Sequence, residues 1–190
     1  MGYQKYVQKL WEKPAESLGA VYKQRLILWR KEQVTVRVEY PTRPDKARRV
    51  GYRAKQGVFI VRQRVDRGGR AKPFPAGGRR TKRYRSRMNL KMNYQWVAEQ
   101  RANDKYVNCE VLNSYFAGKD GQHFWYEVVM VDRDSPTVLA DPILRNIATQ
   151  RGRAYRGLTS AGRKSRALHG RGKGYEKARP SLAAHGGGAK

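Results

Sequence analysis

The stretch CEVLNSYFAGKDGQHFWYEVVMVD, residues 109–132, decides the fold of this chain. Two runs rich in apolar, β-branched and aromatic residues, 109–118 and 123–132, flank KDGQ. The Asp120-Gly121 pair inside KDGQ is a strong turn signal. The pattern therefore predicts a β-hairpin whose two strands form the centre of a sheet.

Two shorter runs before the hairpin predict further strands. In VTVRVEY, residues 34–40, valines alternate with polar residues, which is the pattern of a strand with one buried face. The next run, GVFIVRQRV at residues 57–65, is rich in β-branched residues. Its pattern places Arg62 and Arg64 on the exposed side of the strand.

Apolar residues at helical spacing predict the helices. In residues 3–11 the apolar positions follow i, i+3, i+4, i+7 and i+8, which is one face of a helix. Similar spacing predicts a second helix from residue 15 or 16 to 32 and short helical turns within 138–147. The run from Trp96 to Arg101 indicates a third helix over roughly 90–105. The four tryptophans are expected in the core: Trp11, Trp29 and Trp96 lie in the predicted helices, and Trp125 lies in the second strand of the hairpin.

Together these elements predict an α+β protein. A small antiparallel sheet, in the chain order β-β-α-β-β, has flanking helices, a long basic loop and a Gly/Arg-rich C-terminal extension. We expect a single domain over 1–190, with N-terminal helices in 1–33, an α+β core in 34–142 carrying a basic loop at 67–90, and a basic extension at 143–190. No packed core is expected after Arg151, because apolar residues thin out while glycine recurs.

The charge of the chain indicates a polyanionic partner. Forty-two Lys and Arg against fifteen Asp and Glu give a formal net charge of +27 over 190 residues. The spans 67–98 and 142–175 hold ten and nine basic residues and no acid, whereas 99–141 holds eight acids and four bases. We expect residues 67–87 and the chain beyond residue 151 to be mobile alone and to fold on nucleic acid.

Other classes of function lack candidate residues. The single cysteine, Cys109, and the histidines His123, His169 and His185 do not fall at zinc-ligand spacing, so Cys109 is expected to be a buried thiol and His123 a strand residue. The longest apolar run is far short of the ~18 residues of a membrane span, and the first residues lack the apolar run of a signal peptide. We expect a cytosolic or nuclear protein with no cofactor, metal, small-molecule substrate, membrane or homo-oligomeric partner.

The stretch RGLTSAGRKSR, residues 156–166, comes within one residue of the phosphate-binding loop G-x-x-x-x-G-K-[ST]. Gly157 and Gly162 have the required spacing, but Arg163 occupies the lysine position and shifts Lys164 and Ser165 along by one. On a helical turn that offset rotates both side chains by roughly 100°. We expect this stretch to hold phosphates of an RNA backbone, with its glycines giving flexibility.

Three motifs carry a family resemblance. YPTRPDKARRVGYRAKQG (40–57), VLNSY (111–115) and RGLTSAGRKSR resemble, in this order, the L15e family of large-subunit ribosomal proteins of archaea and eukaryotes. The end RPSLAAHGGGAK (179–190) resembles archaeal members. The resemblance implies a non-catalytic, structural protein of the cytoplasmic ribosome, with an α+β core and long extensions that run into RNA. Its implied partners are large-subunit rRNA and neighbouring large-subunit proteins.

The resemblance also implies which residues contact rRNA. In the first and last motifs these are Arg43, Lys46, Arg48, Arg49, Arg53 and Lys55, and Arg156, Arg163, Lys164 and Arg166. Lys46, Arg49 and Arg53 would share one helical face if Asp45 were the N-cap. The basic spans add Arg67, Arg70, Arg79, Arg80, Lys82, Arg83, Arg85, Arg87, Arg151, Arg153, Arg171 and Lys173. Candidates for stacking on unpaired bases are Tyr52, Tyr84, Tyr155 and Tyr175.

Two other functions stay open on the sequence alone. A DNA-binding or chromatin protein would suit the charge, but the chain shows no helix-turn-helix spacing, zinc knuckle or basic-zipper heptad. An RNA-associated NTPase would use residues 157–165. No apolar strand leads into Gly157, however, and no acid lies between Asp141 and Glu176 to bind a metal ion.

Overall fold

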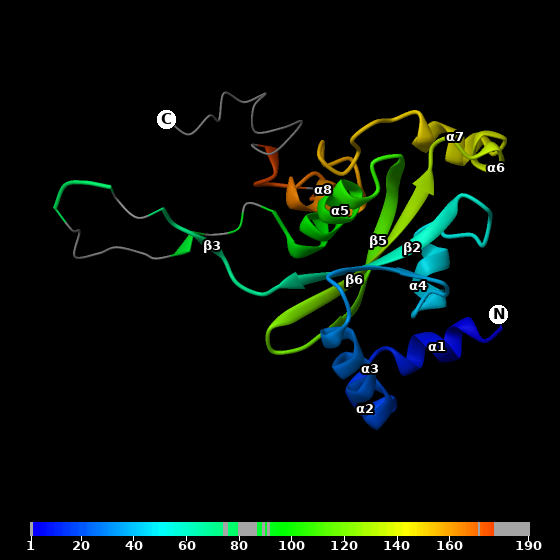
Figure 1. The fold of residues 1–190 in the computed structure, drawn as a ribbon, viewed down its shortest axis with the longest axis horizontal. Helices are drawn as coiled ribbons and strands as arrows, with labels where there is room; N and C mark the ends of the chain where they lie inside the picture. Colours follow the sequence, from blue (N-terminus) through cyan, green and yellow to red (C-terminus); the bar gives the residue numbers. More distant parts are fainter. Residues whose placement is uncertain are drawn as a thin grey trace.

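A computed structural model describes residues 2–73, 76–79, 87–88, 90, 92–170 and 172–176. Its centre is a four-stranded antiparallel sheet in the order β1-β2-β6-β5 (Figure 1). The strands are Thr35–Val38 (β1), Val58–Asp66 (β2), Cys109–Lys119 (β5) and His123–Asp132 (β6). The predicted α+β class, the small antiparallel sheet and its flanking helices are confirmed.

The predicted hairpin is the pair β5 and β6. Asp120 closes its turn, because its Oδ1 accepts hydrogen bonds from the backbone N–H groups of Gln122 and His123 at 2.7 and 2.5 Å. β6 is buried continuously from Trp125 to Val131. Such an unbroken run is typical of a strand that has both faces covered.

Helices cover both faces of this sheet. On one face α4, α6 and α7 pack through Ala47, Val138 and Leu144. On the other face α5 packs through Ala102, together with Ala154 from the chain beyond α7. These helices span Pro44–Arg49 (α4), Tyr94–Lys105 (α5), Pro136–Leu139 (α6) and Pro142–Ala148 (α7). The third predicted helix and the short turns near 138–147 are thus confirmed.

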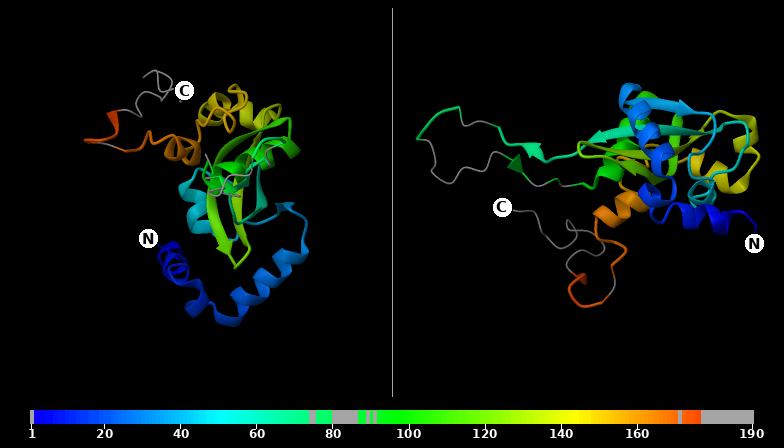
Figure 2. Two further views of the ribbon diagram at one scale, coloured as in Figure 1. Left: turned by 90° about the vertical axis from the view of Figure 1, so that its left-hand side faces the viewer. Right: turned by 90° about the horizontal axis from the view of Figure 1, so that it is seen from below.

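Three N-terminal helices form an arc beside the sheet (Figure 2). They are Gln4–Leu10 (α1), Pro14–Ser17 (α2) and Gly19–Lys31 (α3), so the predicted second helix is in fact two. The helix is interrupted at Leu18, and the next residue, Gly19, has a left-handed φ of +46°. The arc packs on the hairpin through a cluster of Trp11, Tyr22, Leu26, Trp29, Ala117 and Trp125.

The expected exposure of Arg62 on β2 is wrong. Its side chain is buried, donates to Glu32 Oε2 at 2.6 Å, and lies 4.6 Å from the centre of the Trp29 ring. Arg64 is half-buried and donates to the backbone carbonyl of Arg30 at 2.8 Å. The end of α3 covers this side of the strand, which the alternation along β2 alone does not show.

The expectation that the chain has no packed core after Arg151 is wrong for residues 151–165. Ala154, Thr159 and Ala161 are buried there. A further helix, Ser160–Ser165 (α8), packs beside α5 (Figure 1). The segment packs through small side chains and bare backbone, so a count of large apolar residues misses it.

A two-stranded ribbon, which the sequence did not predict, stands at the base of the basic loop. Its strands are Arg70–Ala71 (β3) and Arg87–Met88 (β4), paired antiparallel. The ribbon stands away from the body of the protein (Figures 1 and 2). In the part of the chain that the structure describes, we find no helix of the length and hydropathy that a membrane span requires.

Candidate nucleic-acid interface

The first group of predicted cations lies on and after α4. Arg48, Arg49, Arg53 and Lys55 are exposed, and Lys46 is half-buried. The predicted common face of Lys46, Arg49 and Arg53 is wrong, because the helix ends at Arg49. Its N-cap is Arg43, where Asp45 was expected.

The end of α4 is fixed by its backbone. Gly51 has φ +100°, its N–H donates to Arg48 O at 3.1 Å, and the N–H of Tyr52 donates to Ala47 O at 2.9 Å. This pair of hydrogen bonds is the Schellman arrangement, which requires a residue that tolerates left-handed φ. The chain therefore leaves the helix in one direction and holds Tyr52 and Arg53 in place.

Two cations of this group bind the protein itself. Arg43 is buried, with its guanidinium 4.9 Å from the centre of the Trp11 ring and 3.4 Å from Asp45 Oδ2. Lys55 donates to Asp141 Oδ2 at 2.7 Å, and this hydrogen bond lowers the pKa of Asp141. Arg43 thus joins α1 to α4, while Lys55 holds the loop after α4 near the start of α7.

The glycines of the 156–166 motif pack against each other. Both Gly157 and Gly162 are buried, and a Cβ added to Gly162 would lie 2.5 Å from Gly157 Cα. Thr159 is the N-cap of α8, since its Oγ1 accepts a hydrogen bond from Gly162 N at 3.2 Å. The spacing that imitates a nucleotide loop therefore serves close packing, and the glycines are enclosed in the fold.

The cations of this motif divide into two sets. Arg163 and Lys164 are exposed on α8. Arg166 instead turns back and donates to the carbonyls of Arg156 and Gly157 at 3.2 and 3.3 Å. Arg156 donates to Arg151 O at 2.7 Å. Arg156 and Arg166 thus stabilise the backbone before α8, whereas Arg163 and Lys164 of α8 face solvent.

A buried carboxyl anchors α8 to the core. Glu99 of α5 is fully buried and accepts hydrogen bonds from the hydroxyls of Thr159 and Ser114. Burial raises the pKa of Glu99 to about 7, while the two hydroxyls oppose the shift. Arg153, nearby, donates to Val111 O at 3.2 Å, and burial lowers its pKa. Glu99 was not among the predicted site residues, because its helix is mostly polar and also contains Asp104, so nothing in the sequence distinguishes Glu99.

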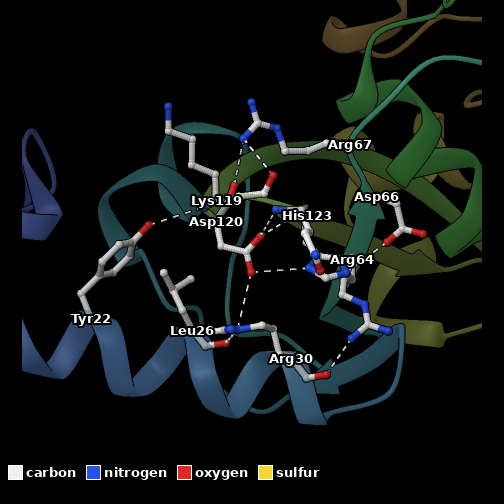
Figure 3. Close-up of polar contacts among 11 residues, drawn as sticks. Tyr22, Leu26, Arg30, Arg64, Asp66, Arg67, Lys119, Asp120 and His123 are labelled. Atoms are coloured by element: carbon white, nitrogen blue, oxygen red, sulfur yellow. Dashed lines mark hydrogen bonds and ion pairs between the residues drawn. The ribbon is translucent and has the colours of Figure 1, made fainter.

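Arg67 holds the base of the basic loop at the hairpin turn (Figure 3). Its guanidinium donates to the carbonyls of Asp120 and Gly121 at 3.1 and 3.3 Å, and lies 5.2 Å from the centre of the Phe124 ring. Asp120 also lies 3.5 Å from Arg30 of α3. The loop therefore leaves the body from a fixed point. His123 is a β6 residue, as predicted.

The remaining predicted residues are scattered. Arg70 and Arg87 lie on β3 and β4, and Arg79, Arg151 and Lys173 are exposed. Tyr155 donates to Asp104, so it packs on the protein, whereas Tyr175 is exposed. Cys109, Trp11, Trp29 and Trp125 are buried as expected, and Trp96 is half-buried. Outside the described residues lie Arg80, Lys82, Arg83, Arg85, Arg171, Tyr84 and the stretch 179–190.

The two motif groups do not meet. α4 packs on the face of the sheet that carries Ile60 and Val129, and the segment leading to α8 packs on the face that carries Val61 and Val128. The exposed cations of α4 and α8 therefore lie on opposite sides of the sheet.

Comparison with known proteins decides the family. The model of the family described as Ribosomal L15 (L15e) matches residues 2–185. This chain belongs to the L15e family. The predicted resemblance is thus confirmed along the chain.

Three relatives of this L15e chain are named large ribosomal subunit protein eL15. The protein of Methanocorpusculum labreanum is 51% identical over 182 residues, that of Picrophilus torridus 50% over 185, and that of Methanocella arvoryzae 45% over 184. Each alignment covers 95% of this chain and 94% of the relative. All three relatives are archaeal, which agrees with the predicted archaeal character.

Proposed function

We propose that this L15e chain is a structural constituent of the large ribosomal subunit that binds large-subunit rRNA through Arg and Lys contacts to phosphates. The observation that carries the proposal is the placement of exposed cations on and next to two helices that pack at opposite sides of one sheet. A protein that reads one DNA groove needs a single basic surface. Cations on opposite sides suit a protein enclosed by several RNA segments.

The contacts we assign to rRNA are those of exposed side chains. On the α4 side they are Arg48, Arg49 and Arg53, and on the α8 side Arg163 and Lys164. Because both helices are already docked on the sheet, the backbone that carries these cations loses little conformational freedom when RNA binds, and the remaining entropic cost is that of ordering the exposed side chains. The basic loop of residues 67–90 adds further cations, and its folding on rRNA stays a prediction.

The same geometry supports a non-catalytic role. The N–H of Gly162 donates a hydrogen bond to Thr159 Oγ1, and Gly157 is buried against Trp96 and Gly162. The backbone amides of this turn therefore do not form an open cradle for the phosphates of a nucleotide. Among the residues that the structure describes, no group of three or more His, Cys, Asp or Glu could hold a metal ion. We therefore propose that the chain positions rRNA and neighbouring ribosomal proteins without a reaction of its own.

The double variant Arg163→Ala with Lys164→Ala is expected to weaken binding to large-subunit rRNA by roughly tenfold or more at modest salt. Each lost phosphate contact removes a charge-assisted hydrogen bond and lowers the slope of log K against log salt by about 1. The measurement is a salt titration of rRNA binding, with DNA duplex as a competitor.

The control removes the same charge from α3 by Lys23→Ala with Lys31→Ala, both exposed residues outside the proposed contacts. If the α8 variant keeps the wild-type slope, α8 does not contact phosphates. If DNA duplex competes as well as rRNA, the chromatin alternative replaces our proposal.

A further inference from the structure

A cavity between α1 and the end of α4 lies beside the cations described above. Its volume is about 490 Å³, and it is lined by Tyr3, Pro41, Pro44, Arg48, Tyr52, Arg53 and Ala54. That volume falls within the usual range of small-ligand pockets. We propose that this cavity binds one unpaired rRNA nucleotide, with its base against the tyrosines and its phosphate at the arginines. This inference rests on the proposed function.

The two tyrosines offer ring faces from separate elements. Tyr3 precedes α1 and is 51% exposed, and the guanidinium of Arg48 lies 5.9 Å from the centre of its ring. Tyr52 is half-buried, packs against the core cluster around Ala47, and is fixed by the Schellman hydrogen bonds at Gly51. One ring is therefore rigid and the other accessible, which suits capture of a base that has left its helix.

The charge around the cavity matches a nucleotide. Arg48 and Arg53 line it, and no carboxylate does. A second cavity, of about 690 Å³, shares Arg48 and is lined by Gly2, Gln4, Lys5, Gln8, Asp45 and Arg49 as well. Its one acid, Asp45, is paired with Arg43. Both cavities lie between α1 and α4, and we call them together the α1–α4 groove. The first offers tyrosine and proline side chains to the base, and the second offers Lys5 and Arg49 to the next phosphate.

A single nucleotide fits this groove better than a duplex does. A duplex presents phosphates and stacked, inaccessible base faces, and it would meet the arginines without filling the space between Tyr3 and Tyr52. An extruded base exposes both of its faces, and stacking on aromatic side chains tolerates any base. The groove therefore fixes one rRNA nucleotide in place by its shape and its aromatic rings.

Leucine variants of the tyrosines test this proposal in the full chain with large-subunit rRNA. Tyr3→Leu and Tyr52→Leu should each weaken binding by roughly five- to 150-fold, the range that corresponds to loss of one stacked base, with the salt slope unchanged. Tyr52→Phe, which keeps the ring, should bind like wild type. Tyr6→Leu is the matched control, since Tyr6 lies on α1, is 70% exposed and does not line the cavity.

Ultraviolet cross-linking of the wild-type complex, mapped by mass spectrometry, should join a nucleotide to Tyr3 or Tyr52. If the wild-type protein binds rRNA, both leucine variants bind rRNA as tightly as wild type and no such cross-link forms, then the cavity does not bind a nucleotide, while the proposed function stands. If wild type does not prefer rRNA to DNA, the proposed function fails and the pocket falls with it. Because Tyr3 is exposed, its variant keeps the test decisive even if Tyr52→Leu disturbs folding.

Discussion

Gly162→Ala is expected to lower the free energy of unfolding by roughly 1–3 kcal/mol. A Cβ at this position would lie 2.5 Å from the Cα and 2.8 Å from the carbonyl carbon of Gly157. Both glycines are buried, and the atoms that the methyl group meets belong to backbone, so no side-chain rotation relieves the clash. Either α8 or the 151–159 turn must move away. Urea denaturation of the free protein measures the loss.

The matched control is Gly121→Ala at the hairpin turn, where an added Cβ meets nothing within 4 Å. Gly121→Ala should lower the free energy of unfolding much less than Gly162→Ala does. Equal stability of the Gly162 variant and wild type would mean that the two backbones are not in contact. The spacing of the two glycines would then need another explanation.

Glu99→Gln is expected to remove a pH dependence of stability between about pH 4.5 and 7. The carboxyl titrates near 4.5 in the unfolded chain, but burial raises its pKa to about 7 in the fold. Between these values the unfolded state loses the proton while the folded state keeps it. The stability from the neutral buried acid is therefore complete below pH 4.5 and is lost as the pH rises to about 7.

The loss corresponds to about 3.5 kcal/mol at most, since one pKa unit is worth about 1.4 kcal/mol. A glutamine imitates the neutral acid and can still bond the hydroxyls of Thr159 and Ser114. The variant should match wild type near pH 4.5 and be the more stable of the two above pH 7. Glu12→Gln, which removes an exposed carboxyl, controls for net charge. A wild-type stability curve as flat as that of Glu99→Gln would contradict the buried, protonated carboxyl.

The sequence predicted correctly those elements whose pattern lies within a single segment of the chain. The 109–132 hairpin appears as predicted because its turn residue, Asp120, makes the turn locally and its apolar runs are long. The helix over roughly 90–105 was predicted from the run between Trp96 and Arg101, which lies within one element. The polyanionic partner also follows from charge alone, which needs no structure.

Features that depend on a second element were missed. Arg62 is covered by Glu32 and Trp29 from α3, and no pattern within β2 reveals this. The docking of residues 151–165 uses Gly157, Gly162 and Ala161, whose small size is the reason they pack closely and the reason a search for large apolar residues overlooks them.

In the candidate site, too, the features encoded within one segment were predicted, and those that depend on a second element were not. Composition identified the basic segments, but it could not separate the cations that serve the fold from those that face solvent. Arg43, Arg156 and Arg166 each bind a ring or a backbone carbonyl of the protein. Tyr3 lines the α1–α4 groove because the N-terminal helix lies beside α4, and no pattern within the sequence predicts that arrangement.

Sedimentation of the native protein tests the central claim most directly. A lysate of the source cells is separated on sucrose gradients at modest and at high salt, and every fraction is probed for this chain. We expect it to travel with the large ribosomal subunit and to stay there after high salt has removed loosely bound factors, because the rRNA contacts that we propose lie on both sides of the sheet. Release into the free fraction at high salt, or co-sedimentation with chromosomal DNA, would contradict its assignment as a structural constituent of that subunit.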